Sequence, residues 1–333
     1  MAKQWSIADR IGTFGSWLMT LLVFVMMALA EKLGLSRQTL RIITSQLQSP
    51  QIKQQAFKGY RPTRHDVLVC TYAKSGTYWT IQIAHQIAHR GRGEFRHIHD
   101  VVPFPEAPMS NTIIKLSDEA PYRAAQTGLR VIKTHLESSY VPYSPEAKYI
   151  VVLRDPKDVF VSSYFFTQGM ISGSMLPVEE WLRLFLAGKF MYGSWVEHLV
   201  GYWPWRNRAN VLFLTFEEMK DDLEEAVRRI AALMDVELTD EEFAQVVEKS
   251  QFQNMKRINQ KFTPERPWPF NKGVKGFAVM RRGARGGSSE LLSPEQQYQI
   301  DQHMKAELQR HGCDFPYEQM FETVSQDASA AAA

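Results

Sequence analysis

Four short runs of aliphatic and β-branched residues stand out along the chain, and longer stretches with helical periodicity separate them. The runs cover residues 67–71, 130–135, 149–153 and 211–215. After the first run, Trp79, Ile83 and Ile87 recur at helical spacing and fall on one face. Short apolar strands that alternate with helices are typical of a parallel sheet covered on both sides. The pattern therefore predicts a three-layer α/β fold with a central parallel sheet.

Polar residues that suit helix ends mark where the helices begin. Asp155 precedes Pro156, and proline is favoured at the first helical position, so a helix through Ser162 is predicted. Further helices are predicted at 217–234, at 240–250 and, as the last helix, from Ser293 onward. Residues 266–287 are rich in proline, glycine and basic side chains and predict a long loop.

The pattern divides the chain into three parts. We expect an apolar anchor with linking helices at 1–58, the main domain at 59–320 and a disordered tail at 321–333. Ile11–Ala30 carries no charged residue and is just long enough to span a bilayer. A shallow membrane anchor, a cleavable signal peptide and a packed helix are the alternatives. We expect membrane association through residues 11–30, with the main domain facing the cytosol.

The charge balance narrows the class of partner. The 333 residues include 39 basic and 36 acidic side chains, which leaves a net charge of only +3. A nucleic-acid-binding domain would show a strong basic excess, so no nucleic-acid partner is expected. The two cysteines, Cys70 and Cys313, are too few for a disulfide scaffold and indicate a reduced, cytoplasmic protein.

The end of the first apolar run predicts an anion site. The strand passes into a loop holding Lys74, Ser75, Gly76 and Thr77, and a helix follows. Backbone N–H groups at such a helix start point toward one spot, and the helix dipole adds positive potential there. With one lysine and two hydroxyls beside it, the loop is suited to hold a phosphate or a sulfate.

Further basic residues follow other predicted strands. Lys133 and His135 end the second run, and Arg154 follows the third. Ligands of parallel sheets bind at the carboxyl ends of the strands. One site is therefore expected to gather these side chains with Lys74.

The loop differs from the phosphate-binding loop of NTPases. It lacks the first glycine and reads Lys-Ser-Gly-Thr where a Walker A motif has Gly-Lys-Ser/Thr. No strand ends in the magnesium-binding aspartate that is usual for those enzymes. A nucleotide phosphate is expected without metal-dependent hydrolysis, and a P-loop-type kinase or NTPase stays as an alternative.

Thr71–Trp79 resembles the 5′-phosphosulfate loop of the cytosolic-type sulfotransferases, Thr-Tyr-Pro-Lys-Ser-Gly-Thr-x-Trp. The resemblance continues in order from about Gly59 to Pro316. The other matching segments are Lys133–Leu136, Arg154 with Ser162, Tyr192–His198, Phe216–Met219 and Arg281–Gly286. Several motifs in the family's order are far more specific than any one of them.

The resemblance implies in-line transfer of a sulfuryl group from 3′-phosphoadenosine 5′-phosphosulfate (PAPS) to a hydroxyl or an amine, without a metal. His135 is implied as the base, because the ordinary pKa of histidine allows proton uptake near neutrality. The residues implied in catalysis are His135, Lys74, Lys133 and Ser162. The residues implied in cofactor binding are Lys74, Ser75, Gly76, Thr77, Tyr78, Trp79, Arg154, Ser162, Phe216, Ser250, Phe252, Arg281, Arg282 and Gly283.

On the acceptor side, Phe104 matches a family residue that lines the pocket, and Phe165 and Phe166 follow Ser162 where other pocket residues lie. A hydrophobic or lipid-like alcohol, phenol or amine is implied as the acceptor. Ala73 and Phe216 depart from the family's usual proline and tyrosine, and no dimer motif is visible, so the oligomeric state stays open. A membrane-tethered nucleotide-binding protein without catalysis and a lumenal carbohydrate sulfotransferase are further alternatives.

Overall fold

The computed structural model describes residues 49–107, 113–171, 176–189, 193–263, 279–283 and 286–321, with scattered positions between 21 and 42. Its sheet has four strands, β1 (Asp66–Thr71), β2 (Arg130–Thr134), β3 (Lys148–Leu153) and β4 (Val211–Thr215). The strands lie in the order β2-β1-β3-β4 and all neighbours pair in parallel. Each predicted apolar run forms a strand, so the predicted parallel sheet is confirmed.

Helices lie before, between and after the strands. They are α3 (Pro50–Ala56), α4 (Thr77–Ala88), α5 (Ala120–Ala124), α6 (Pro156–Ile171), α7 (Val178–Leu186), α8 (Trp195–Tyr202), α9 (Phe216–Asp221), α10 (Leu223–Leu233), α11 (Asp240–Ser250), α12 (Phe252–Arg257), α13 (Pro294–Arg310) and α14 (Tyr317–Phe321). Short 3-10 turns are η1 (Ile98–Asp100), η3 (Ser138–Tyr140), η4 (Trp203–Trp205), η5 (Asn259–Phe262) and η7 (Ser288–Glu290).

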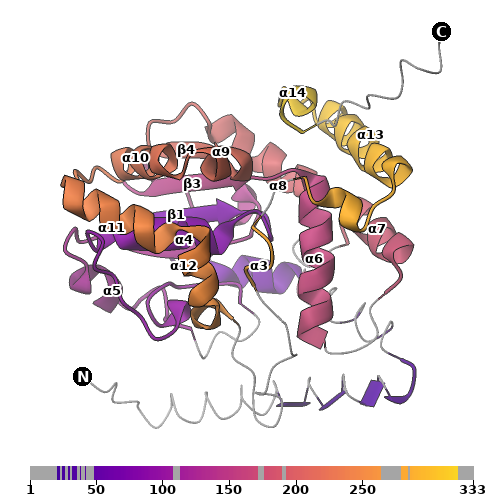
Figure 1. Cartoon of the computed structure of the whole chain (residues 1–333), viewed down its shortest axis with the longest axis horizontal. Coiled ribbons are helices and arrows are strands. Elements are labelled where there is room, and N and C mark those ends of the chain that lie inside the picture. The colour runs from indigo at the N-terminus through magenta and orange to yellow at the C-terminus, as the bar shows by residue number, and fades with distance from the viewer. Residues whose placement is uncertain are drawn as a thin grey trace.

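The sheet has a separate hydrophobic core on each face, because successive side chains of a strand point to opposite sides. Val67 and Val69 pack with residues of α4, α10 and α11. Leu68 and Cys70 pack with residues of α8 and α13. In Figure 1, α4, α10 and α11 lie together beside the strands, whereas α6, α7, α13 and α14 gather toward the right. Covering both faces explains why the strands are continuously apolar.

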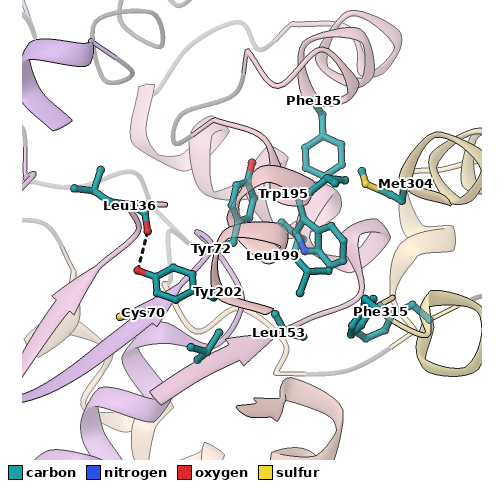
Figure 2. Close-up of a cluster of buried hydrophobic side chains, with 14 of the residues drawn as sticks. Cys70, Tyr72, Leu136, Leu153, Phe185, Trp195, Leu199, Tyr202, Met304 and Phe315 are labelled. Carbon is teal, nitrogen blue, oxygen red and sulfur yellow. Dashed lines mark hydrogen bonds between the residues drawn. The ribbon is translucent and has the colours of Figure 1, made fainter. Parts of the chain in front are cut away.

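The core on the face of Leu68 and Cys70 holds the chain in place just beyond β2. Figure 2 shows Tyr202, Trp195 and Leu199 packed beside Cys70 and Leu153. The hydroxyl of Tyr202 donates a hydrogen bond to the carbonyl oxygen of Leu136 at 3.1 Å. Large buried aromatic side chains dominate packing energetics. The segment that follows His135 is therefore fixed by the core.

Two helix predictions need correction. The single helix predicted at 217–234 is two helices, α9 and α10, because Asp222 adopts an extended conformation between them. Its carboxylate accepts a hydrogen bond from the Glu225 amide at 2.9 Å and caps α10. The helix that begins after Ser293 is not the last one, since α14 follows it. Phe321 ends α14 and is buried, so it is not part of a disordered tail.

Some predicted segments lie outside the described residues. These are 322–333, most of the 266–287 loop and much of the apolar segment at 11–30. Among the residues that are described, no helix has the length and hydropathy needed to cross a membrane.

Candidate active site

The loop between β1 and α4 has the backbone geometry of an anion-binding turn. Lys74 and Gly76 both have left-handed backbones, with φ of 71° and 93°. Alternation into this region turns successive N–H groups toward one point. A Cβ atom at Gly76 would lie 2.9 Å from a ring carbon of Phe216, so the position requires glycine. The hydroxyls of Thr71 and Thr77 are 2.6 Å apart and tie the strand end to the helix start.

Four basic side chains converge beside this loop. The pKa of Lys74 is lowered to about 7 by burial and then by the charges of Arg154, Lys133 and Arg281. Arg154 donates a hydrogen bond to the carbonyl oxygen of Lys74 at 3.0 Å. Cations held this close repel one another, and a bound anion relieves that repulsion. The structure thus brings together the residues that the sequence placed at the strand ends.

His135 lies directly after β2 with its tautomer fixed. Its Nδ1 is 2.8 Å from the carbonyl oxygen of Thr71, which only accepts, so Nδ1 carries the proton and Nε2 is the basic nitrogen. Burial, followed by the charge of Lys133, holds the pKa of His135 well below its ordinary value. At neutral pH the ring is therefore neutral and suited to accept a proton at Nε2.

Glu106 supports the end of β2, and sequence reasoning assigned it no role. Its Oε1 accepts hydrogen bonds from the His135 amide at 2.5 Å and from the Thr134 hydroxyl at 3.0 Å. Its Oε2 is buried without a hydrogen-bond partner among the described residues, and burial raises the pKa of the carboxyl to about 7. The available signal was an acidic residue inside a proline-rich apolar loop.

Asp158 joins Arg154 to the glycine-rich loop near the end of the chain. Its carboxylate accepts hydrogen bonds from the Gly286 and Gly287 amides at 3.1 and 3.0 Å, and it lies 3.5 Å from Arg154. The sequence motifs gave Asp158 no part in the site. Ser162 lies two turns into α6, and its side chain is half-buried.

The two arginines of that loop share one carboxylate. Arg281 makes two contacts with Glu290, at 2.7 and 2.8 Å, and Arg282 makes one at 2.7 Å. Gly283 leaves no room for a side chain, because a Cβ there would come within 2.2 Å of the Phe252 ring. Glu290 had no place in the sequence prediction.

One region holds four of the predicted cofactor-binding residues, Trp79, Phe216, Ser250 and Phe252. Trp79 donates a hydrogen bond from Nε1 to the carbonyl oxygen of Ser250 at 2.7 Å, and its ring meets Phe216 edge-on. Phe252 starts α12 two residues after Ser250. The hydroxyls of Ser75 and Ser250 are buried and lack a hydrogen-bond partner within the described part of the chain. Buried polar atoms of this kind, beside the clustered cations, fit a polar anionic ligand such as PAPS.

Each of the three predicted acceptor-pocket phenylalanines lies against a cation. Lys133 Nζ is 3.9 Å from the Phe104 ring centre, Lys74 Nζ is 4.0 Å from that of Phe166, and the Arg281 guanidinium is 4.2 Å from that of Phe165. Phe104 also packs edge-on against His135 at 5.4 Å. Phe104 is thus the one placed beside the predicted base.

The predicted absence of a metal stays a prediction. Within the described ranges, no group of three or more His, Cys, Asp or Glu side chains is arranged to hold a metal ion. Cys70 and Cys313 are both free thiols.

Comparison with known proteins agrees with this geometry. A model of the sulfotransferase domain matches residues 64–312. The amine sulfotransferase of Oryctolagus cuniculus is 32% identical over 263 residues, covering 75% of this chain and 82% of that protein. The 3-beta-hydroxysteroid sulfotransferase of Cavia porcellus is 28% identical over 260 residues, covering 76% of this chain and 87% of the relative.

A crystal structure of a mouse sulfotransferase complexed with PAP has the same fold. Its TM-score is 0.59 at 23% identity, with 79% of this chain and 91% of that chain covered. The family match does not favour a kinase or an NTPase. Since the family model spans most of the chain, the chain belongs to the sulfotransferase domain family and is a PAPS-dependent sulfotransferase, as its motifs predict.

Proposed function

We propose that the site transfers the sulfuryl group of PAPS to the hydroxyl or amine of a hydrophobic acceptor, with His135 as the base. One observation carries this proposal. Four cations converge on the loop of Lys74, and His135 lies beside them with its basic nitrogen set by the Thr71 carbonyl. The arrangement combines an anion holder with a proton acceptor, and transfer from an anionic donor to a protic acceptor needs both.

Two groups of side chains divide the work on the donor. PAPS supplies the sulfuryl group, and its 5′-phosphate is the leaving group. Lys74 and Lys133 provide positive charge where that phosphate oxygen gains negative charge. Arg154, Ser162, Arg281, Arg282 and Gly283 would hold the 3′-phosphate. Guanidinium groups suit this task because they donate two parallel hydrogen bonds.

His135 accepts the proton of the acceptor at Nε2. Its low pKa keeps this nitrogen unprotonated at neutral pH. Once Nε2 has taken up the proton, the hydrogen bond from Nδ1 to the Thr71 carbonyl stabilises the imidazolium. Glu106, which accepts from the His135 amide, keeps the backbone at this point from shifting. The chain therefore holds the base in position before the acceptor arrives.

Transfer of labelled sulfate from PAPS tests the proposal. We expect His135→Ala to lower the rate by about 10²–10⁴-fold while PAP binding is retained. Arg154→Ala should weaken PAP binding by about 10- to 100-fold, because it removes charge-assisted hydrogen bonds. Normal transfer by His135→Ala would refute the catalytic assignment, and unchanged PAP affinity in Arg154→Ala would refute the 3′-phosphate assignment.

We infer a hydrophobic acceptor from the surroundings of the base. The Phe104 ring packs edge-on against the His135 ring, so the base has an apolar neighbour. The two relatives described above are named for an amine and for a 3-beta-hydroxysteroid. A panel of steroid alcohols, phenols and hydrophobic amines would identify the class, and preferred sulfation of a carbohydrate would contradict the inference.

We also propose that the N-terminal segment rests on a membrane surface, with the main domain in the cytoplasm. Leu22, Met26, Leu29 and Leu33 are between 47% and 70% exposed. Leu22, Met26 and Leu29 are helical, and their spacing of four and three residues places them on one helical face. An exposed apolar stripe of this kind suits the boundary of a bilayer, where hydrophobic acceptors concentrate.

Co-sedimentation of the full chain with phosphatidylcholine vesicles tests this attachment. We expect Leu22→Glu combined with Leu29→Glu to release most of the bound protein, because both charges would have to enter apolar lipid. Tyr298→Glu, which alters an exposed aromatic residue on α13, is the matched control. Equal sedimentation of all three proteins would rule the attachment out.

A further inference from the structure

A hydrogen-bonded chain leads away from Lys133 on the side of α4 and η1. Lys133 Nζ donates to the hydroxyl oxygen of Tyr78 at 3.2 Å, and that hydroxyl is 3.3 Å from His99 Nε2. The other nitrogen of His99, Nδ1, is 3.0 Å from the carbonyl oxygen of Val102. Tyr78 of α4 and His99 of η1 are thereby connected to a single lysine.

The direction of each hydrogen bond follows from the last acceptor. A carbonyl oxygen only accepts, so His99 Nδ1 carries its proton and Nε2 of the neutral ring is an acceptor. The Tyr78 hydroxyl therefore donates to His99 and presents its lone pairs to Lys133. His97 fixes the same end, since its Nδ1 accepts from the His99 amide at 3.2 Å while its Nε2 donates to the Thr263 carbonyl at 3.0 Å.

The surroundings give this chain an energetic role. Lys133 is only 3% exposed, and its ammonium group lies over the rings of Phe104 and Tyr78 at 3.9 and 4.4 Å. Burial penalises the charged form and lowers the pKa of Lys133 to about 7. A phenol oxygen that accepts from the ammonium group favours the charged form. An oxygen whose own proton is donated to His99 is a better acceptor.

Both supporting groups keep their forms across neutral pH. Burial raises the pKa of Tyr78 and lowers that of His99 to about 3, so the phenol stays protonated and the imidazole stays neutral. The other ionisable groups that act on or feel Lys133 are Glu106, His135 and Lys74. Of these, Glu106 raises the pKa of Lys133, whereas Lys74 repels its charge.

We propose that Tyr78 and His99 are a positioning pair, in which the hydroxyl of Tyr78, oriented by His99, holds the Lys133 ammonium group charged and aimed at the site of sulfuryl transfer. The inference rests on the proposed role of Lys133. It changes the role predicted for Tyr78, which acts through Lys133 and not by contact with the nucleotide. It also gives a role to His99, which no sequence motif included.

The test compares four variants with a matched control. Tyr78→Phe keeps the ring and removes the hydroxyl. His99→Leu removes the acceptor of that hydroxyl, and His99→Gln returns an acceptor near the place of Nε2. The fourth variant combines Tyr78→Phe with His99→Leu. Tyr149→Phe is the control, because its buried hydroxyl donates to the Pro142 carbonyl at the opposite end of the sheet.

The first readout is the pKa of Lys133 itself, followed by ¹³C chemical shift in lysine-labelled protein and assigned with Lys133→Met. We expect Tyr78→Phe to lower this pKa by about one unit, since a hydrogen bond to a charged group is lost. His99→Leu should lower it by less, and His99→Gln should restore it. The double variant should shift no further than Tyr78→Phe, because both residues act through one bond.

The second readout is the pH profile of transfer from PAPS to 2-naphthol, a 3β-hydroxysteroid and a hydrophobic primary amine. In Tyr78→Phe the fall of the rate at alkaline pH should begin about one pH unit lower than in wild type. At a given pH in that range the rate should be about tenfold lower. PAP affinity at pH 5, where Lys133 is mostly charged in every variant, should stay within twofold of wild type.

The outcomes separate the inference from the function on which it rests. Failure of the wild-type protein to sulfate any probe would count against the proposed function, while the pKa measurement would still test the pair. A wild-type enzyme that transfers, with an unmoved Lys133 pKa in Tyr78→Phe, overturns the inference alone. An equal shift in Tyr149→Phe overturns it too. If Tyr78→Phe does not fold, the two His99 variants decide. The inference is overturned if His99→Leu lowers the Lys133 pKa and His99→Gln lowers it equally.

Discussion

Lys133 carries its positive charge where almost no water reaches it. The side chain is held among Phe104, Tyr78 and the backbone of β2, and its amide donates to the Pro103 carbonyl at 2.9 Å. Burying a cation costs stability unless strong partners compensate for the lost water. The Tyr78 hydroxyl and the aromatic rings of Tyr78 and Phe104 compensate only in part. The same placement makes the charge effective against an anion, because nearby water would screen it.

Replacing this lysine should therefore stabilise the protein while it abolishes transfer. We expect Lys133→Met to raise the free energy of unfolding by about 1–4 kcal/mol at pH 7 without ligand. The folded pKa, about 7, lies below the unfolded value of 10.5. The unfolded chain thus binds more protons between those limits, and this lysine adds stability as pH rises from about 7 to 10.5.

Thermal unfolding at pH 6.5 and pH 9 measures both effects. Wild type should gain more stability than Lys133→Met over that interval, and Lys148→Met, at the far end of the sheet, is the control. A lower melting temperature in Lys133→Met at pH 6.5 would show that the cation stabilises the fold.

At the scale of elements, the basic loop at 281–287 depends on carboxylates that hold it from two sides. Asp158 of α6 accepts its glycine amides, and Glu290 of η7 pairs with both arginines. Asp158 is buried and fixes the backbone, whereas Glu290 neutralises the arginines that are proposed to receive the 3′-phosphate. A phosphate at that place competes with the Glu290 carboxylate.

Removing the Glu290 charge should favour the nucleotide. We expect Glu290→Gln to bind PAP about five- to tenfold more tightly. In the variant, the 3′-phosphate no longer has to displace a carboxylate from the arginines. AMP, which lacks the 3′-phosphate, should bind equally to both proteins. Calorimetry with the two nucleotides measures the difference. Weaker PAP binding in the variant would mean that Glu290 preorganises the arginines.

The whole site behaves as a set of coupled charges around the ligand. Lys74 and Lys133 both have a pKa near 7 because both are buried, and the charges of neighbouring cations lower the pKa of Lys74 further. A phosphate bound among them stabilises their charged forms and raises both values. Near pH 7.5, where both lysines are partly deprotonated, binding must take up protons.

We expect about one proton to be taken up when PAP binds at pH 7.5, and almost none at pH 5.5, where both lysines are already charged. The heat of binding in buffers of different ionisation enthalpy reports this number directly. Lys133→Met should reduce it. Buffer-independent heats at pH 7.5 would contradict the coupling.

Local pattern alone accounts for a large part of the molecule. The four apolar runs become strands because a parallel strand covered on both faces must be apolar throughout, and that requirement is visible in the sequence. The positions of Lys74, His135 and Arg154 follow, since residues after parallel strands share one edge of the sheet. The break at Asp222 escaped prediction because helical periodicity continues across it, and only its extended backbone separates the two helices.

Tertiary structure decided which side chains form hydrogen bonds and ion pairs with one another in the site. Glu106 meets His135 from 29 residues away, Asp158 meets Gly286 from 128 residues away, and Tyr78 meets His99 from 21 residues away. No local rule of spacing connects such pairs, because loops of any length can bring them together. The sequence by itself determined the sheet, the anion loop and the sulfotransferase motifs. The protonation of the base, the support of Lys133 and the pairing of the arginines arise only when distant segments exclude water around them.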